Sequence, residues 1–179
     1  MDKIINAQRV ISTAVEKRDI AESALLRLCA YWERFVDHHL VACVNCDHSQ
    51  LSDHFAVSIP PHPSWDLCHA LIIGVGYTDF RSFGDLKGYT KKLLHDDSNP
   101  FLRVTNAHAN KIDEVYRIRN YLSHYSAASS RSLWNLYSKT YEMKRFLEPG
   151  QFVLAYGAQR LWAYFDAFEG ASSDMKVWY

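Results

Sequence analysis

Apolar residues recur at three- and four-residue spacing through residues 18–45, the longest regular stretch of the chain. The members of this stripe are Ala24, Leu25, Leu28, Tyr31, Trp32, Phe35, Val36 and Leu40. The spacing matches the period of an α-helix that buries one face. It predicts a long helix that carries much of the core.

A second strong helix is predicted after the break at residues 96–100, where the chain reads DDSNP. Thr105 or Asn106 can cap it, and its apolar positions, which fit the helical period, are Ile112, Val115, Ile118 and Leu122. The small polar run at residues 123–130 predicts its end, because serine side chains compete for backbone hydrogen bonds.

The remaining pattern predicts helices over residues 2–17, 131–147 and 151–168, the last two separated by Pro149-Gly150. Residues 47–105 are less regular. They contain a proline-rich loop at residues 58–66, a helix starting at Ser64 or a short strand over residues 70–76, and a helix over residues 82–96. We expect an all-α antiparallel bundle of about five helices, with an irregular insertion at residues 47–105, folded as a single domain over residues 1–179.

Composition supports helices, because seven Gly and five Pro in 179 residues are few for a chain of short strands and turns. Twenty basic residues balance twenty acidic ones, so any site for a polyanion must be local. One cationic patch is formed by Lys111, Arg117, Arg119 and Arg131. A solvated helix face is the alternative reading of this patch. No apolar run suggests a membrane span or a signal peptide, and a cytoplasmic protein is expected.

The patch contains the sequence RNYLSH, which begins at Arg119 and ends at His124. Cleavage of RNA without a metal needs an acid or base that works near neutral pH and a cation for the phosphate. Histidine supplies the first, and the planar donor fork of arginine supplies the second. These residues are therefore candidates for phosphate chemistry.

The Arg-x4-His spacing alone is weak evidence, since Arg34–His39 and Arg103–His108 have it too. The first pair lies inside the long predicted helix, and the second straddles a helix start. Only Arg119 is followed directly by Asn, and only its His lies where a helix gives way to a loop. Loops beside rigid elements often carry function.

With these features the chain resembles the HEPN superfamily, helical-bundle domains of prokaryotic toxins and RNA-processing nucleases. RNYLSH matches the family's Arg-Asn-x3-His signature, and LLRLCAYWERFVDHHL resembles its N-terminal core helix. The closest likeness is to branches associated with RNA-repair ligases and with restriction or toxin loci. In one branch a Tyr lies two positions beyond the His; here Tyr125 follows it directly.

The resemblance implies a metal-independent endoribonuclease whose products carry a 2′,3′-cyclic phosphate and a 5′-OH. Arg119 would stabilise charge, His124 would transfer protons, and Asn120 would be a polar positioning residue. Arg117 and Tyr125 would support the site. The implied partners are the RNA substrate, a second copy of the chain, and an antitoxin or neighbouring-gene protein; no cofactor or metal is expected.

Helical geometry constrains this site. A five-residue step turns a helix by roughly 140°, so Arg119 and His124 would point apart on one straight helix. Either the helix ends near Leu122 and His124 turns back, or two subunits pair their motifs across a dimer cleft. Glu33 is a candidate carboxylate partner for Arg119.

Other motifs carry less information. Cys43 and Cys46 form a C-x2-C with His48 nearby. Zinc would need further ligands, with Cys68, His69 or His54 as candidates, and two ordinary thiols are the alternative. The aromatic stripes Trp134, Tyr137 and Tyr141, and Trp162 and Phe165, suit a core or dimer interface better than base stacking. A HEPN-like module without catalysis, binding a partner protein, nucleotide or RNA, is the alternative function.

Overall fold

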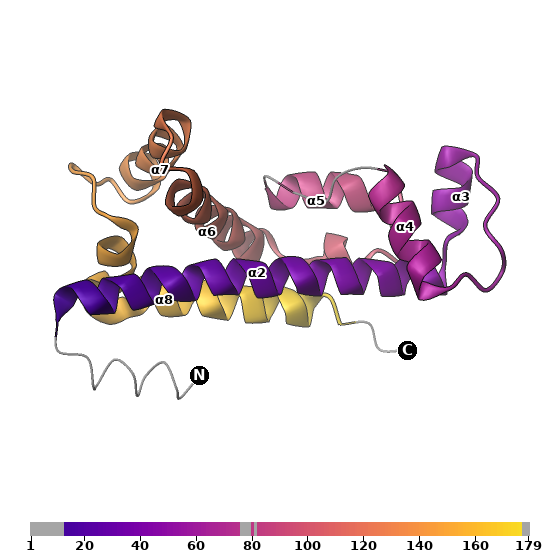
Figure 1. Cartoon of the computed structure of the whole chain (residues 1–179), viewed down its shortest axis with the longest axis horizontal. Coiled ribbons are helices and arrows are strands. Elements are labelled where there is room, and N and C mark those ends of the chain that lie inside the picture. Colours follow the sequence, from indigo (N-terminus) through magenta and orange to yellow (C-terminus); the bar gives the residue numbers. More distant parts are fainter. Residues whose placement is uncertain (1–12, 76–79, 81, 177–179) are drawn as a thin grey trace. The chain divides into compact units, whose positions relative to one another are not determined.

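The computed structural model describes residues 13–75, 80 and 82–176, and within these ranges the chain is helical and contains no strand. The prediction of an all-α protein is confirmed. Figure 1 labels the α-helices, whose bounds are α2 Ala14–Cys46, α3 Ser49–Phe55, α4 Trp65–Val75, α5 Phe83–Thr90, α6 Asn106–His124, α7 Ala127–Thr140 and α8 Pro149–Asp174. A short 3-10 helix, η1 Pro100–Arg103, lies between α5 and α6 in the chain. The helix predicted over residues 2–17 lies largely outside the described residues.

The chain divides into two compact units. Unit 1 comprises Met1–Ala30 and Glu114–Asp166, and unit 2 comprises Tyr31–Asp113 and Ala167–Tyr179. Among the described residues, no helix is both long enough and apolar enough to cross a bilayer. The expectation of a single domain over the whole chain stays a prediction.

The long helix α2 is confirmed, but its buried face differs slightly from the predicted one. The buried positions are Ala21, Leu25, Cys29, Trp32, Val36, Leu40, Val41 and Val44. Tyr31 was placed in the apolar stripe, yet 69% of it is exposed. It lies one residue, or roughly 100° of helix, from Trp32, so both cannot share the centre of one buried face.

The insertion at residues 47–105 is more helical than the sequence indicates. Helix α3 was not predicted, and the alternative of a strand at residues 70–76 is wrong for residues 70–75, which are helical. Helix α4 follows the proposed cap, since the Ser64 hydroxyl accepts from the Leu67 amide at 3.2 Å. Helix α5 ends at Thr90 instead of extending to residue 96.

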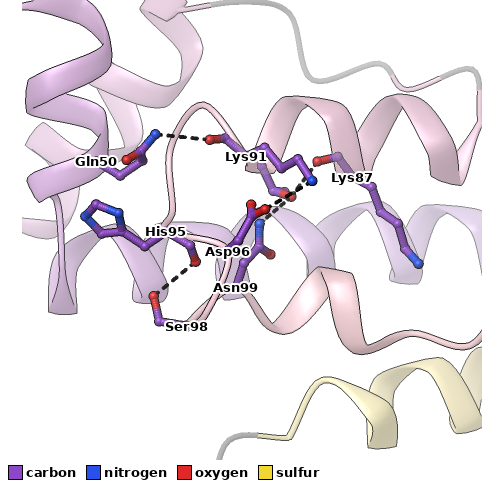
Figure 2. A network of polar contacts seen from close by, with 8 residues as sticks. Gln50, Lys87, Lys91, His95, Asp96, Ser98 and Asn99 are labelled. Atoms are coloured by element: carbon purple, nitrogen blue, oxygen red, sulfur yellow. Dashed lines mark hydrogen bonds and ion pairs between the residues drawn. The ribbon is translucent and has the colours of Figure 1, made fainter.

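A polar network orders the chain after α5, within unit 2 (Figure 2). The side-chain amide of Asn99 donates to the Thr90 hydroxyl at 3.0 Å, and the Phe101 backbone amide donates to the side-chain oxygen Oδ1 of Asn99 at 3.0 Å. Lys91 pairs with Asp96 at 3.2 Å. Asn99 is 1% exposed. Its side chain therefore supplies hydrogen bonds to polar groups of this turn that are buried away from water.

Helices of unit 1 meet at a buried carboxylate. Glu114 of α6 accepts hydrogen bonds from the Tyr141 hydroxyl at 2.5 Å and from the Tyr164 hydroxyl at 2.9 Å. Burial first, and then the Glu114 charge, raises the pKa of Tyr164. The hydroxyl therefore remains a donor at neutral pH, and the three side chains connect α6, α8 and the segment after α7.

Helix α8 is interrupted at Ala155–Ala158, where the backbone leaves helical geometry and Tyr156 has a φ of 56°. The Phe152 carbonyl lies three residues before this break and accepts from a side chain. The Arg160 guanidinium donates to that carbonyl at 2.9 Å and lies 4.4 Å from the centre of the Phe152 ring. Arg160 thus stabilises the interruption.

His39 in unit 2 is packed between aromatic rings as a largely apolar side chain. Its ring stacks on Phe35 with ring centres 5.5 Å apart and meets Phe101 edge-on at 5.6 Å. Its Nε2 atom is buried and has no hydrogen-bond partner among the residues that the structure describes. Burial lowers the pKa of His39, and a hydrogen bond with the Met175 backbone offsets part of that effect. The neutral form is therefore favoured in the folded state.

We expect His39→Phe to weaken the loss of stability on acidification. Because the pKa of His39 is lower in the folded than in the unfolded chain, the unfolded chain binds the proton first as pH falls below about 6.5. The free energy of unfolding therefore falls as the pH drops from about 6.5 through the pKa of His39 in the folded chain. Urea unfolding at pH 7.5 and 5.0 measures the difference, with His38→Phe, an exposed neighbour, as control. Equal losses in wild type and His39→Phe would contradict this assignment.

Candidate active site

The three predicted catalytic residues lie on the last two turns of α6. The Arg119 guanidinium donates from Nη1 to Oδ1 of Asn120 at 3.0 Å. Both residues are half-buried, whereas His124 is exposed at the final helical position. A half-buried arginine held by its neighbour and an exposed histidine suit an anion site open to solvent.

Helix α6 continues to His124, so the arrangement in which the helix ends near Leu122 and His124 turns back is wrong. Tyr125 is the first residue beyond the helix, with a φ of 44°, and its amide donates to the Tyr121 carbonyl at 2.9 Å. This bond completes the last turn and keeps His124 helical. Arg119 and His124 therefore point about 140° apart on one chain.

The supporting candidates lie in different places. Tyr125 is exposed, and its ring centre is 5.2 Å from that of Tyr121. Arg117 is exposed on α6. Glu33 is half-buried on α2 in unit 2, whereas Arg119 belongs to unit 1, so their pairing stays a prediction.

The short connection from α6 to α7 is determined by serines. The Ser126 hydroxyl accepts from the Ser129 amide at 3.1 Å, and the Ser129 hydroxyl accepts from the Ser126 amide at 3.0 Å. This capping box starts α7 three residues after α6 ends. The first turns of α7 are thereby held close to the end of α6 within unit 1.

A hollow of about 570 Å³ lies in unit 1, and Tyr121 of the RNYLSH motif is one of its walls. The other aromatic walls are Trp134 of α7 and Phe146 of the segment between α7 and α8. The ring centre of Phe146 lies 5.5 Å from the ring centre of Tyr121 and 5.5 Å from that of Tyr137. This packing anchors the segment that forms one side of the open hollow.

Charged side chains complete the lining, namely Arg131, Lys144, Arg145 and Glu148. The Tyr121 hydroxyl donates to Glu148 Oε2 at 3.4 Å. Burial, and then the Glu148 carboxylate, raises the pKa of Tyr121, so this hydroxyl is a donor and not a base at neutral pH. Three cations and one carboxylate beside aromatic rings can receive an anionic, planar ligand.

The sequence did not predict this hollow, because residues 141–147 were assigned to a helix. Helix α7 instead ends at Thr140, and Glu142 has a φ of 51°. Of the aromatic stripe, Tyr137 is fully buried as expected for core, but Trp134 is half-buried and lines the hollow. The available signal was the spacing of Ser130, Arg131 and Trp134, which places them on one helical face.

The other Arg-x4-His pairs lie in different surroundings. Arg34 and Arg103 are exposed, and His39 packs against Phe35 and Phe101. His108 forms a 2.7 Å contact from Nδ1 to Asp174 Oδ2. That RNYLSH and not these pairs forms the site stays a prediction.

Cys43 and Cys46 lie in the last turn of α2 as free thiols. Within the described residues, no group of three or more His, Cys, Asp or Glu side chains could hold a metal ion. The Nε2 atom of His69 lies 3.5 Å from Asp37 Oδ2. Cys68 is buried, and its Sγ atom accepts from the side-chain amide of Asn45 at 3.6 Å. The zinc reading therefore gains no support from this region.

We expect iodoacetamide to alkylate Cys46 well before Cys43 at pH 8. Burial, and then the neighbouring Cys46, raises the pKa of the Cys43 thiol to about 11. Roughly one Cys43 in a thousand would be thiolate at pH 8, and only the thiolate reacts. Peptide mass spectrometry of timed samples measures both sites, with urea-unfolded chain as the control. Equal alkylation rates at Cys43 and Cys46 in the folded protein would contradict the burial of the Cys43 thiol.

Comparisons with protein-family models, with curated proteins and with solved structures find no match for this chain. Its function is therefore inferred from its own residues and their geometry.

Proposed function

We propose that the chain is a metal-independent endoribonuclease of the HEPN type, acting in a prokaryotic toxin-antitoxin or defence system. The observation that carries this proposal is the end of α6. There Arg119 is held by Asn120 at 3.0 Å, and His124 is exposed at the last helical position. The adjoining cationic and aromatic hollow supplies a surface for the RNA beside this motif.

In the proposed reaction the RNA 2′-oxygen attacks the neighbouring phosphorus. A bond forms from phosphorus to O2′, the bond from phosphorus to O5′ breaks, and the proton lost by the 2′-OH is balanced by one gained by the leaving O5′. His124 transfers protons, and Arg119 stabilises the charge that develops on the phosphate oxygens. Asn120 positions the guanidinium.

The site is proposed to be shared by two copies of the chain. Because α6 is helical through His124, Arg119 and His124 of one copy diverge by about 140°. Two motifs facing one another across a two-fold axis would place both residue types around one phosphate. Glu33, Arg117 and Tyr125 remain proposed supporting residues, and an antitoxin or neighbouring-gene protein remains a proposed partner.

The test is incubation of a single-stranded RNA and its all-DNA counterpart with the purified protein in EDTA. We expect the RNA to be cut and the DNA to stay intact, because the attacking group is the 2′-OH. If the folded protein leaves RNA intact but binds it, the alternative of a catalytically silent HEPN-like module is favoured. Equal cleavage of DNA would exclude the proposed chemistry.

A further inference from the structure

We propose that the hollow between α7 and residues 144–148 binds a guanine nucleotide of single-stranded RNA, next to the cleavage site. The inference rests on the proposed function and adds a base preference to it. The hollow, about 570 Å³ in volume, is in the usual size range for small-ligand sites. Its lining contains aromatic, cationic and acidic side chains, which we assign to the base, the phosphate and the edge of the base.

Aromatic side chains provide the surface for the base. Trp134 is half-buried, so one part of the indole is fixed by packing while another part faces the hollow. Phe146 is 37% exposed although its ring is packed near Tyr121 and Tyr137. Such rings are already ordered, so stacking a base on them costs little side-chain entropy.

Cations from two segments of the chain line the hollow and provide for the phosphate. Arg131 precedes Trp134 by one helical turn, and Lys144 and Arg145 directly precede the anchored Phe146. With Glu148 as the one carboxylate in the lining, the formal charge of the hollow is three minus one, or +2. This excess in a chain of zero net charge favours an anionic ligand.

Glu148 gives the preference for guanine. Its backbone carbonyl accepts the Phe152 amide at 3.0 Å, and its side chain accepts from the Tyr121 hydroxyl at 3.4 Å, so its place at the start of α8 is restrained. A carboxylate has two acceptor oxygens and no donor. Guanine alone among the four RNA bases offers two adjacent donors, N1–H and N2–H, on its Watson–Crick edge, and can pair with both oxygens.

The experiment is calorimetric titration of the full chain with 5′-GMP, 5′-AMP, 5′-CMP, 5′-UMP, guanosine and inorganic phosphate. We expect GMP to bind at least roughly tenfold more tightly than the other nucleotides, in line with the discrimination given by a bidentate pair. Guanosine and phosphate should each bind more weakly than GMP. Trp134→Ala and the double change Lys144→Ala/Arg145→Ala should weaken GMP binding, and Glu148→Gln should reduce the preference over AMP.

Matched controls are Trp162→Phe and Lys139→Ala, whose side chains lie outside the lining, with circular dichroism to confirm folding. Absence of GMP binding, equal binding of GMP and AMP, or equal loss in Lys139→Ala would overturn the inference. RNA cleavage is assayed on the same samples. If GMP binds but RNA is not cut, guanine binding in the hollow is supported and the proposed nuclease activity is contradicted. If RNA is cut but GMP does not bind, only the inference about the hollow is overturned.

Discussion

Arg119→Ala and His124→Ala should each lower the rate of RNA cleavage by about 10²–10⁴-fold, the range typical of a lost charge stabiliser or proton-transfer group. His124 is exposed at the end of α6, so its removal leaves the packing of the helix intact. The loss should therefore appear in catalysis while the unfolding midpoint stays close to wild type. Initial rates on a labelled RNA in EDTA measure the effect.

The other spacing matches supply the controls. Arg34→Ala and Arg103→Ala remove exposed arginines from the same Arg-x4-His pattern and should leave the cleavage rate unchanged. Asn120→Ala should give an intermediate loss, because Arg119 keeps its charge but loses the 3.0 Å bond that orients it. If Arg34→Ala or Arg103→Ala matched the losses at Arg119 and His124, the assignment of the site would be wrong.

Gly150→Ala should lower the free energy of unfolding by about 1–3 kcal/mol, the usual cost of overpacking a close contact. A Cβ at Gly150 would lie 2.8 Å from the Cβ and the carbonyl oxygen of Arg18 and 2.9 Å from its Cα. Backbone atoms cannot rotate aside. The shift would also strain the 2.7 Å bond from the Gly150 amide to Glu22 Oε1.

The matched control is Gly88→Ala. Gly88 lies inside α5, and a Cβ there would meet nothing within 4 Å. Alanine should stabilise that helix by roughly 0.5–1 kcal/mol, because glycine loses more backbone freedom on folding. Urea unfolding of both variants measures the difference. Gly150→Ala with wild-type stability would disprove the close packing of α8 on the start of α2 in unit 1.

Helices with a strong apolar period could be predicted from the sequence. The long helix α2 and the core positions Ile112, Val115 and Ile118 of α6 follow from spacing alone. Tyr31 shows the limit, since a residue 100° off the buried face still looks apolar in a list of positions. Helix α3 was missed because its seven residues are short for a periodicity signal.

Long-range contacts explain what the sequence could not indicate. Residues 141–147 look helical, but Tyr141 bonds to Glu114 and Phe146 packs on Tyr121 and Tyr137. These partners precede the segment by up to 27 residues, beyond the reach of local pattern. The hollow that this segment helps to form could therefore not be predicted from the local sequence pattern.

The candidate site was partly accessible from the sequence. The change from helix to loop near His124 is visible in the composition, whereas the bond from Arg119 to Asn120 is seen only in the structure. The exact end of α6 is not visible in the composition, because it depends on the left-handed backbone of Tyr125 and the capping box that follows. Such details follow from hydrogen bonds that composition does not specify.

The chemistry of the RNA ends left by the wild-type protein in EDTA tests the central claim most directly. Mass spectrometry of the fragments should find a 2′,3′-cyclic phosphate on one product and a 5′-OH on the other, because the 2′-oxygen is the nucleophile and O5′ the leaving group. Products with a 5′-phosphate, or RNA that stays intact with folded protein, would contradict a ribonuclease site at Arg119 and His124.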